Sequence, residues 1–466
     1  MTTTRPVVAV FDIGKTNKKL FLFDEDYRIV FEESATLEET VDEDGDPCES
    51  LETLESFVFS SLRKVFLDSR YAVEAVNFSN YGASFVHIDE EGKPVTPLYN
   101  YLKPFPTDLL RQFYNTYGGE QLFSAQTASP VLGHLNSGMQ LYWLKYASLH
   151  RFKRIACSMH LPQYLSYLLT GRCFSERTSI GCHTNLWDFE KEDYHHWVYR
   201  EGINEKLAPI VPSNHVAVTS VRNGQYNVGV GLHDSSAALI PYLHSFSEPF
   251  VLLSTGTWCI SLNPFNQTLL TQTELQQDCL CYLTYEGKSV KASRLFSGNE
   301  HEQQTKRLAA HFNKPYDYYK SVQLNPYFLQ NRSAHFQSFQ REPVAGTALQ
   351  TSAFANRDLS AFVSYEEAYH QLLEDLVAQQ VDSTQLVLNG APVKKLFVDG
   401  GFSKNKIYMH LLAEAFPQLE VYAASMAQAS ALGAALAVHH AWNKKPLPNG
   451  MVDLKCFSPA GTSFPG

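Results

Sequence analysis

The chain has 466 residues, which is more than one ordinary hydrophobic core can hold, so two or three domains are expected. Hydrophobic residues make up 44% and charged residues 18%, as in globular rather than disordered proteins. The formal net charge of −10 argues against binding to nucleic acid through its phosphate backbone. A small phosphorylated ligand stays compatible with this net charge, because backbone amides and a metal ion can neutralise the phosphate locally.

Cysteine spacing and apolar runs predict the compartment. No two of the eight cysteines have the CxxC spacing, so neither a disulfide framework nor a zinc site is expected. No signal peptide opens the chain, and no apolar run approaches the roughly 20 residues that span a bilayer. We therefore expect a cytoplasmic protein without a membrane segment; a homodimer is compatible with the sequence.

The first third of the chain predicts strands and then a helix. Three apolar runs separated by tight turns indicate an antiparallel meander, at residues 7–11, 20–23 and 29–31. The acidic piece 38–49 is expected to be a solvated loop. Apolar residues at helical spacing predict a helix over 51–66. Further strands are expected at 75–79 and 85–88, on either side of the turn 80–82.

The later part of the chain repeats the layout of its beginning. Residues 107–170 are mainly helical in pattern, and a break near 244–249 precedes a strand, a Gly/Thr turn and another strand. The same succession occurs at 7–23, as expected of a duplicated fold with two phosphate-facing hairpins. A helix over 427–437, with Gly433 and many alanines, would allow tight packing between two lobes.

The first glycine turn follows an apolar strand that ends at Asp12. A carboxylate there can hold Mg²⁺, often through water. Donors to phosphate follow at Gly14, Thr16 and Asn17. The alternative is an Asx-turn that only caps the strand. Lys15 and Lys18 would reach phosphate oxygens or lie exposed in the turn.

Two further glycine turns occur in the second half of the chain. Thr255, Gly256 and Thr257 place two hydroxyls around a free backbone, although threonine is also an ordinary strand residue. The run 399–405 reads as a strand end, a turn and a helix start, with Gly400, Gly401 and Asn405. Such a turn lets a nucleotide base and ribose lie against the backbone; a plain strand–helix turn is the alternative.

Asp234 is the candidate general base. It follows a glycine-rich strand and precedes a helix of small residues, so its carboxylate would lie at a helix N-terminus, where negative charge is stabilised. Transfer of a phosphoryl group to a hydroxyl needs a carboxylate placed to accept the proton. The alternative for Asp234 is an N-cap. His233 would bind a sugar hydroxyl or be a structural turn histidine.

The order of these motifs resembles the FGGY carbohydrate kinases of the actin-like ATPase superfamily, over roughly residues 7–440. Further matches to the family signatures lie at 136–144, 161–171, 399–414 and 431–435. Gln140 stands where a lysine is usual. The resemblance implies an α/β fold with two actin-like (ribonuclease H-like) lobes and a cleft between them. It also implies a sugar-binding lobe over 1–245, a nucleotide-binding lobe over 246–445 and a peripheral tail over 446–466.

The resemblance further implies roles for single residues in an ATP- and Mg²⁺-dependent sugar kinase. Asp12 is the metal-associated carboxylate and Asp234 the catalytic base. The nucleotide would be bound by Gly14, Lys15, Thr16, Asn17, Thr255, Gly256, Thr257, Gly400, Gly401 and Asn405. The substrate would be bound by Asn80, Tyr81, Gly82, His233 and Asp234.

Two segments depart from the family pattern and bear on the substrate. The usual sugar loop is replaced at 79–84, and the usual Trp-x-Asp-x-Arg segment at 100–104. Residues 233–237 are similar to a stretch of L-rhamnulose kinases and, nearby, L-fuculose kinases, so a 6-deoxyketose phosphorylated at a primary hydroxyl is expected. Its methyl group would need an apolar contact such as Tyr81, Phe85 or Tyr101.

Three alternatives stay open from the sequence. The first is that the chain acts on another ketose or a polyol, as xylulose and glycerol kinases do. The second is that it binds ATP as an actin-like regulator without transfer activity, as the altered sugar loop suggests. A plain ATPase or chaperone of the superfamily is the third, and the retained Asp234 counts against both of the latter.

Overall fold

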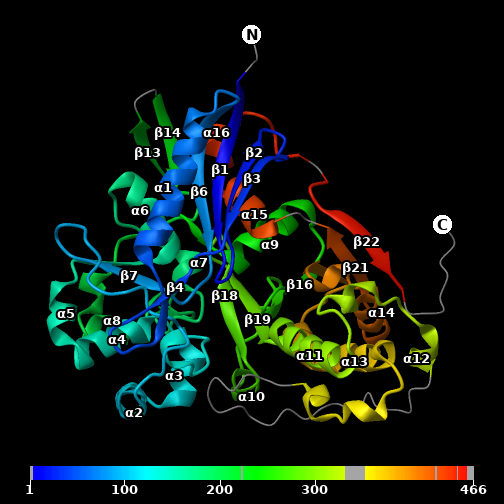
Figure 1. Ribbon diagram of the computed structural model, residues 1–466. Coiled ribbons are helices and arrows are strands. Elements are labelled where there is room, and N and C mark those ends of the chain that lie inside the picture. Colours follow the sequence, from blue (N-terminus) through cyan, green and yellow to red (C-terminus); the bar gives the residue numbers. More distant parts are fainter. Residues whose placement is uncertain (1–3, 222–223, 331–351, 426–427, 449, 459–466) are drawn as a thin grey trace. The chain divides into compact units, whose positions relative to one another are not determined.

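A computed structural model describes residues 4–221, 224–330, 352–425, 428–448 and 450–458 (Figure 1). The chain divides into two compact units, which are treated separately. The first contains residues 1–245, 281–289 and 427–451, and the second contains 246–280, 290–426 and 452–466. The segments 281–289 and 427–445, which the sequence-based boundaries place in the second lobe, thus belong to the first unit, as do residues 446–451 of the expected tail. No helix among the described residues is long and apolar enough to cross a membrane.

A seven-stranded mixed sheet forms the centre of the first unit. Its order is β13-β14-β6-β1-β2-β3, and β15 also pairs with β6. The strands are β1 (Arg5–Ile13), β2 (Lys18–Asp24), β3 (Ile29–Ala35), β6 (Tyr71–Asn80), β13 (Val216–Val221), β14 (Gly224–Gly229) and β15 (Leu232–His233). Pairing of β1 with β2 and of β2 with β3 is antiparallel, which confirms the predicted meander. β6 lies parallel to β1, β14 and β15.

Helices cover both faces of this sheet, which explains why β1 is apolar at consecutive positions. Val7, Ala9 and Phe11 face a core shared with α1 (Leu51–Leu67) and α6 (Leu161–Thr170). The helix α1 matches the predicted one, and Ser50 caps it by accepting a bond from the Thr53 amide. Helices α9 (Asp234–Ser245) and α15 (Ala429–Ala437) also pack on the sheet (Figure 1).

A layer of short elements completes the first unit. Its helices are α2 (Thr107–Thr116), α3 (Glu120–Gln126), α4 (Gly138–Ala147), α5 (Leu149–Arg154), α7 (Arg177–Ile180), α8 (His196–Arg200) and α16 (His439–Trp442). Its strands are β4 (Glu39–Val41), β5 (Pro47–Glu49), β7 (Phe85–Ile88), β8 (Cys157–His160), β9 (Ser175–Glu176), β10 (Trp187–Asp188), β11 (Asp193–Tyr194) and β12 (Ile210–Val211). The predicted strand at 85–88 is β7, which pairs with β8.

The second unit is built on another seven-stranded sheet, in the order β18-β19-β17-β16-β20-β21-β22. Its strands are β16 (Phe250–Thr255), β17 (Cys259–Asn263), β18 (Cys279–Leu283), β19 (Ser289–Leu295), β20 (Lys395–Gly400), β21 (Glu420–Ser425) and β22 (Asp453–Phe457). Its helices are α10 (Gln272–Gln276), α11 (Ser297–His311), α12 (Pro326–Gln330), α13 (Tyr365–Leu388) and α14 (Lys406–Ala415). Within the tail that was expected to be peripheral, β22 forms the edge strand of this sheet.

The closest helix contact of the first unit joins α9 and α15. A Cβ atom built on Gly433 would lie 1.8 Å from the carbonyl oxygen of Ala237, so only glycine fits there. The tight packing predicted for this helix therefore occurs, but inside the first unit and not between two lobes. This contact holds α15 against the helix that begins with Asp234.

We expect Gly433→Ala to lower the free energy of unfolding by about 1–3 kcal/mol, because the added methyl group must push the two helices apart. Urea denaturation monitored by circular dichroism measures this change. Gly224→Ala is the matched control, since a Cβ there meets no atom within 4 Å. Equal stability of the Gly433→Ala variant and the wild type would contradict this account of the contact.

Candidate functional site

The candidate residues of the first unit lie where neighbouring strands end. Across the parallel strands, Asp12 of β1 lies opposite Ser79 of β6, and Asn80 of β6 lies opposite His233 of β15. The carboxyl ends of parallel strands share one edge of a sheet, where α/β proteins bind their ligands. Asp234 follows His233 directly as the first residue of α9. The fold thus brings together residues that are more than 200 positions apart in the sequence.

Asp12 is a carboxylate in surroundings that favour its protonated form. Burial, and then the charge of Asp234, raise the pKa of Asp12 to about 7 from its ordinary value of 3.8. The Ser430 hydroxyl of α15 lies 3.1 Å from each Asp12 oxygen. A desolvated carboxylate near a second negative charge is a suitable place for a divalent cation, which prefers oxygen ligands. Asp12 therefore fits a Mg²⁺ ion, directly or through water.

Asp234 is held by one of its two oxygens. Oδ1 accepts hydrogen bonds from the backbone amide of Ser235 at 2.6 Å and from the Ser235 hydroxyl at 3.1 Å. The Nε2 atom of His233 lies 3.3 Å from the same oxygen. Burial raises the pKa of Asp234 to about 6. The amide it binds is that of the next residue, whereas an N-cap binds the amide two or three positions on.

The substrate-side turn shows three different environments. Within the described part of the chain, neither side-chain atom of the fully buried Asn80 has a hydrogen-bond partner. Its amide is therefore suited to a ligand or to water. The Tyr81 hydroxyl donates to Glu49 Oε1 at 2.8 Å. A Cβ atom on Gly82 would lie 2.7 Å from Cys182 Sγ and 3.1 Å from His233 Cδ2, which explains the glycine.

The first glycine turn is closed by internal bonds. Gly14 donates its amide to the carbonyl oxygen of Asn17 at 2.9 Å, while Thr16 and Asn17 are exposed. Lys18 is buried, and its ammonium group bonds to the carbonyl oxygens of Gly14 and Lys15 at 3.0 and 2.9 Å. The alternative of an exposed turn lysine is therefore wrong for Lys18.

Glu49 joins this turn to the substrate-side turn. Its carboxylate forms ion pairs with Lys18 at 2.8 Å and with Lys15 at 3.2 Å, and it accepts the Tyr81 hydroxyl. Lys15 also pairs with Glu39 at 3.4 Å, so its charge is already shared between two carboxylates. Sequence reasoning missed Glu49, because its only signal was its place in an acidic stretch.

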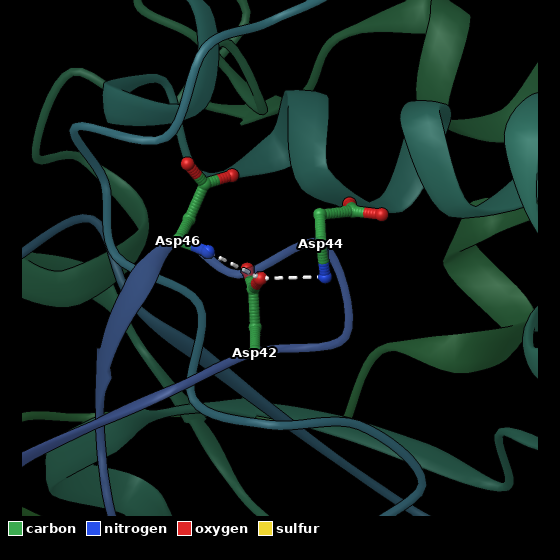
Figure 2. Close-up of side chains that lie close together, drawn as sticks. All are labelled: Asp42, Asp44 and Asp46. Atoms are coloured by element: carbon green, nitrogen blue, oxygen red, sulfur yellow. Dashed lines mark hydrogen bonds between the residues drawn. The ribbon is translucent and has the colours of Figure 1, made fainter.

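That acidic stretch is largely exposed, as expected, but it forms a hairpin of β4 and β5 in which Asp42, Cys48 and Glu49 are buried. The carboxylates of Asp42, Asp44 and Asp46 have spacing suited to a metal ion (Figure 2). Asp42 Oδ1 accepts the backbone amides of Asp44 and Asp46. The Lys103 ammonium lies 2.7, 2.8 and 2.7 Å from Asp42, Asp44 and Asp46. The Lys103 ammonium thus offsets part of the negative charge of the cluster and joins it to the segment 100–104, which departs from the family pattern.

The candidate residues of the second unit also lie at neighbouring strand ends. β16 and β20 are parallel, and Thr255 lies opposite Gly400. The Thr255 hydroxyl donates to the Asp399 carbonyl oxygen at 2.5 Å and accepts the Phe402 amide at 3.0 Å. Gly401 donates its amide to the Thr255 carbonyl oxygen at 2.9 Å. The Thr255 side chain therefore joins the two glycine turns.

The glycines of these turns are required by close backbone approach. A Cβ on Gly400, whose φ is +87°, would lie 1.9 Å from the carbonyl oxygen of Thr255. A Cβ on Gly298, at the start of α11, would lie 1.8 Å from the carbonyl oxygen of Gly256. Gly400, Gly401 and Thr257 are exposed, so their backbone is open to a ligand. Asn405 instead caps α14, with its side chain bonded to the amides of residues 407 and 408.

Two family models match adjacent parts of the chain. The model of the FGGY family of carbohydrate kinases, N-terminal domain, matches residues 7–240. The model described as carbohydrate kinase FGGY, C-terminal domain, matches residues 247–446. A rhamnulokinase of Mannheimia succiniciproducens is 23% identical over 274 residues, which cover 54% of this chain and 52% of that protein. The chain spans about half the length of the curated relatives it matches.

Solved structures with the same fold cover nearly the whole chain. The carbohydrate kinase from Novosphingobium aromaticivorans has a TM-score of 0.74 at 23% identity, with 98% of this chain and 95% of that chain covered. The xylulose kinase from Rhodospirillum rubrum has a TM-score of 0.78 at 16% identity, with 98% and 94% covered. The chain therefore has the two-domain α/β fold of these carbohydrate kinases, which confirms the predicted α/β fold class.

The raised pKa of Asp12 predicts how stability responds to pH. Asp12 holds its proton more tightly in the folded than in the unfolded chain, so the folded state loses stability as pH rises from about 4 to about 7. Asp12→Asn removes this loss. In metal-free buffer at pH 8 we expect the variant to melt about 2–4 °C above the wild type, with a smaller difference at pH 5.

Asp26→Asn is the control of opposite sign. The hydrogen bond from Lys445 lowers the pKa of Asp26, so its contribution to stability is present above pH 4 and is lost on acidification. Calorimetric scans between pH 3 and 8 compare the two variants with the wild type. A pH-independent difference for Asp12→Asn would contradict the raised pKa.

Proposed function

Because the chain belongs to the FGGY family of carbohydrate kinases, we propose that it transfers the γ-phosphoryl group of ATP to a primary hydroxyl of a small sugar. The observation that carries this proposal is the carboxylate of Asp234 at the strand ends of the first unit. Its Oδ1 atom is fixed by Ser235, and its pKa is raised to about 6. It is therefore a stronger base than an ordinary carboxylate and is still ionised near neutral pH.

The proton moves from the sugar hydroxyl to Asp234 as the oxygen attacks the γ-phosphorus and the bond to the β-phosphate oxygen of ADP breaks. Asp12 would hold Mg²⁺, which supplies charge neutralisation of the phosphates when bound. In the first unit, the exposed Thr16 and Asn17 beside Gly14 would donate to phosphate oxygens. Lys15 would do so only if it exchanged its contacts with Glu39 and Glu49.

The nucleotide is assigned to the glycine turns of the second unit. Exposed backbone at Thr257, Gly400 and Gly401 allows phosphate and ribose to approach without obstruction by side chains. Gly256 is fixed beside the start of α11. The side chains of Thr255 and Asn405 are engaged inside the protein, so we assign them to shaping these turns.

A 6-deoxyketose such as L-rhamnulose or L-fuculose is the proposed sugar. Supporting it are residues 233–237 and the curated relatives named rhamnulokinase. The buried Asn80 amide would pair with a sugar hydroxyl, which satisfies its unmet hydrogen bonds. Other ketoses, glycerol and a regulator that only binds ATP are the competing functions. A cytoplasmic location is part of the same proposal.

The assay of function is ADP release from ATP and Mg²⁺ with L-rhamnulose, L-fuculose, D-xylulose, D-gluconate or glycerol. We expect one 6-deoxyketose to give the highest rate. Asp234→Asn should lower kcat roughly 10²–10⁴-fold, because the neutral amide cannot accept the proton. Binding of ATP, measured by calorimetry, should stay within a few-fold of the wild type.

The other outcomes of this assay are equally definite. If the protein binds ATP but releases no ADP with any of these sugars, the result would favour the ATP-binding regulator over the kinase. If the rate is highest with D-xylulose or glycerol, the kinase function would stand and the proposal of a 6-deoxyketose substrate would be wrong. Full activity of Asp234→Asn would remove Asp234 from the role of base.

The pH profile of turnover supplies a separate test. The ionised form of Asp234 accepts the proton, so kcat should fall tenfold per pH unit below about pH 6. A carboxylate with an ordinary pKa would keep kcat constant down to about pH 4. A flat profile between pH 7 and pH 4.5 would contradict the assignment.

A further inference from the structure

A thiol, an imidazole and a carboxylate lie in a row at the end of β15. Cys182 Sγ lies 3.0 Å from His233 Nε2, which in turn lies 3.3 Å from Asp234 Oδ1. Cys182 and His233 are buried, whereas Asp234 is partly exposed. Both neighbours thus meet the imidazole at the same nitrogen, on the side that faces the proposed base.

The imidazole is enclosed on further sides. The His233 backbone amide donates to the Thr178 hydroxyl at 3.0 Å. The ring of Tyr282 lies 5.2 Å from that of His233. Gly82 closes another side, because a Cβ there would lie 3.2 Å from His233 Nε2 and 2.7 Å from Cys182 Sγ. The surrounding groups therefore fix the position of the ring, and only a glycine at position 82 leaves room for it.

All described contacts of the Asp234 carboxylate fall on one oxygen. Oδ1 accepts the amide and hydroxyl hydrogens of Ser235, and His233 Nε2 lies 3.3 Å from the same oxygen. A hydrogen on Nε2 would be shared between this oxygen and Cys182 Sγ, which lies 3.0 Å from the same nitrogen. A carboxylate bound at Oδ1 in this way can turn little, which leaves Oδ2 to accept a proton in a fixed direction.

We infer that His233 is a positioning residue for Asp234, and that Cys182 holds the His233 ring in place for that task. This inference rests on the proposed function of Asp234 as the base. It differs from a role of His233 in binding the sugar, because the nitrogen that faces Asp234 also contacts a buried thiol. Cys182 thereby becomes a determinant of turnover, although it reaches the base only through the imidazole.

Substitutions at His233 separate positioning from sugar binding. His233→Leu removes the donor, and we expect kcat to fall roughly tenfold or more while KM for sugar and ATP changes less than about threefold. His233→Gln places an amide donor near the former Nε2 and should recover most of the turnover. A raised KM for the sugar with unchanged kcat would show that His233 binds the sugar and would overturn the inference.

Substitutions at Cys182 test the second part. We expect Cys182→Ala to lower kcat several-fold and Cys182→Ser, which keeps a hydrogen-bonding group, to lie closer to the wild type. His87→Gln is the matched control, since His87 is also fully buried in the first unit and contacts Ser158. Equal kcat for Cys182→Ala and the wild type would remove Cys182 from the inference. Rates are normalised to the ATP-binding fraction, so that loss of folded protein is not counted.

A spectroscopic measurement tests the geometry without any sugar. In protein labelled with ¹⁵N-histidine, the His233 signals are identified by their loss in His233→Gln. Its Nε2 signal should shift in both Cys182→Ala and Asp234→Asn and stay unchanged in His87→Gln. An unchanged signal in the first two variants would overturn the inference even if the kinase assay gave no activity.

The outcomes for Asp234 and His233 are distinguishable. If Asp234→Asn is fully active, the proposed base is wrong and the inference fails with it. If Asp234→Asn is inactive but His233→Leu keeps normal kcat and KM, the base stands and only the positioning role fails.

Discussion

The site of the first unit depends on the cost of placing two carboxylates, Asp12 and Asp234, at one edge of a sheet. Each is buried enough to resist ionisation, and the charge of Asp234 adds to the cost at Asp12. In the proposed function, a cation held by Asp12 would relieve the repulsion within this pair, and Asp234 would accept the substrate proton. The chemistry proposed for this chain uses both.

The surrounding structure serves to keep these two groups in place. The α9–α15 contact at Gly433 holds the start of α9 and the Ser430 hydroxyl relative to β1. Glu49 in turn joins the Lys15–Lys18 turn to Tyr81 through its ion pairs and the Tyr81 hydroxyl. Buried ion pairs of this kind contribute little net stability, but they fix geometry when every member is satisfied. We therefore regard the Glu49 contacts as a framework for the two turns.

Lysines that invite a phosphate-binding interpretation are engaged elsewhere in this protein. Lys18 closes the first glycine turn, and Lys103 pairs with three aspartates. Charge type and spacing therefore do not define a ligand site unless the partners of each charge are known.

The sequence by itself determined the family, the fold class, the glycine turns and the position of Asp234 at the start of a helix. These features are local, because strand, turn and helix signals act over a few residues. Domain membership of 281–289 and 427–451 was decided only by tertiary contacts. So were the engaged side chains of Thr255 and Asn405, whose polar residue types had indicated contact with nucleotide. Cys182, Glu49 and Ser430 gave no usable signal, since each acts through a partner far away in sequence that only the folded chain brings within bonding distance.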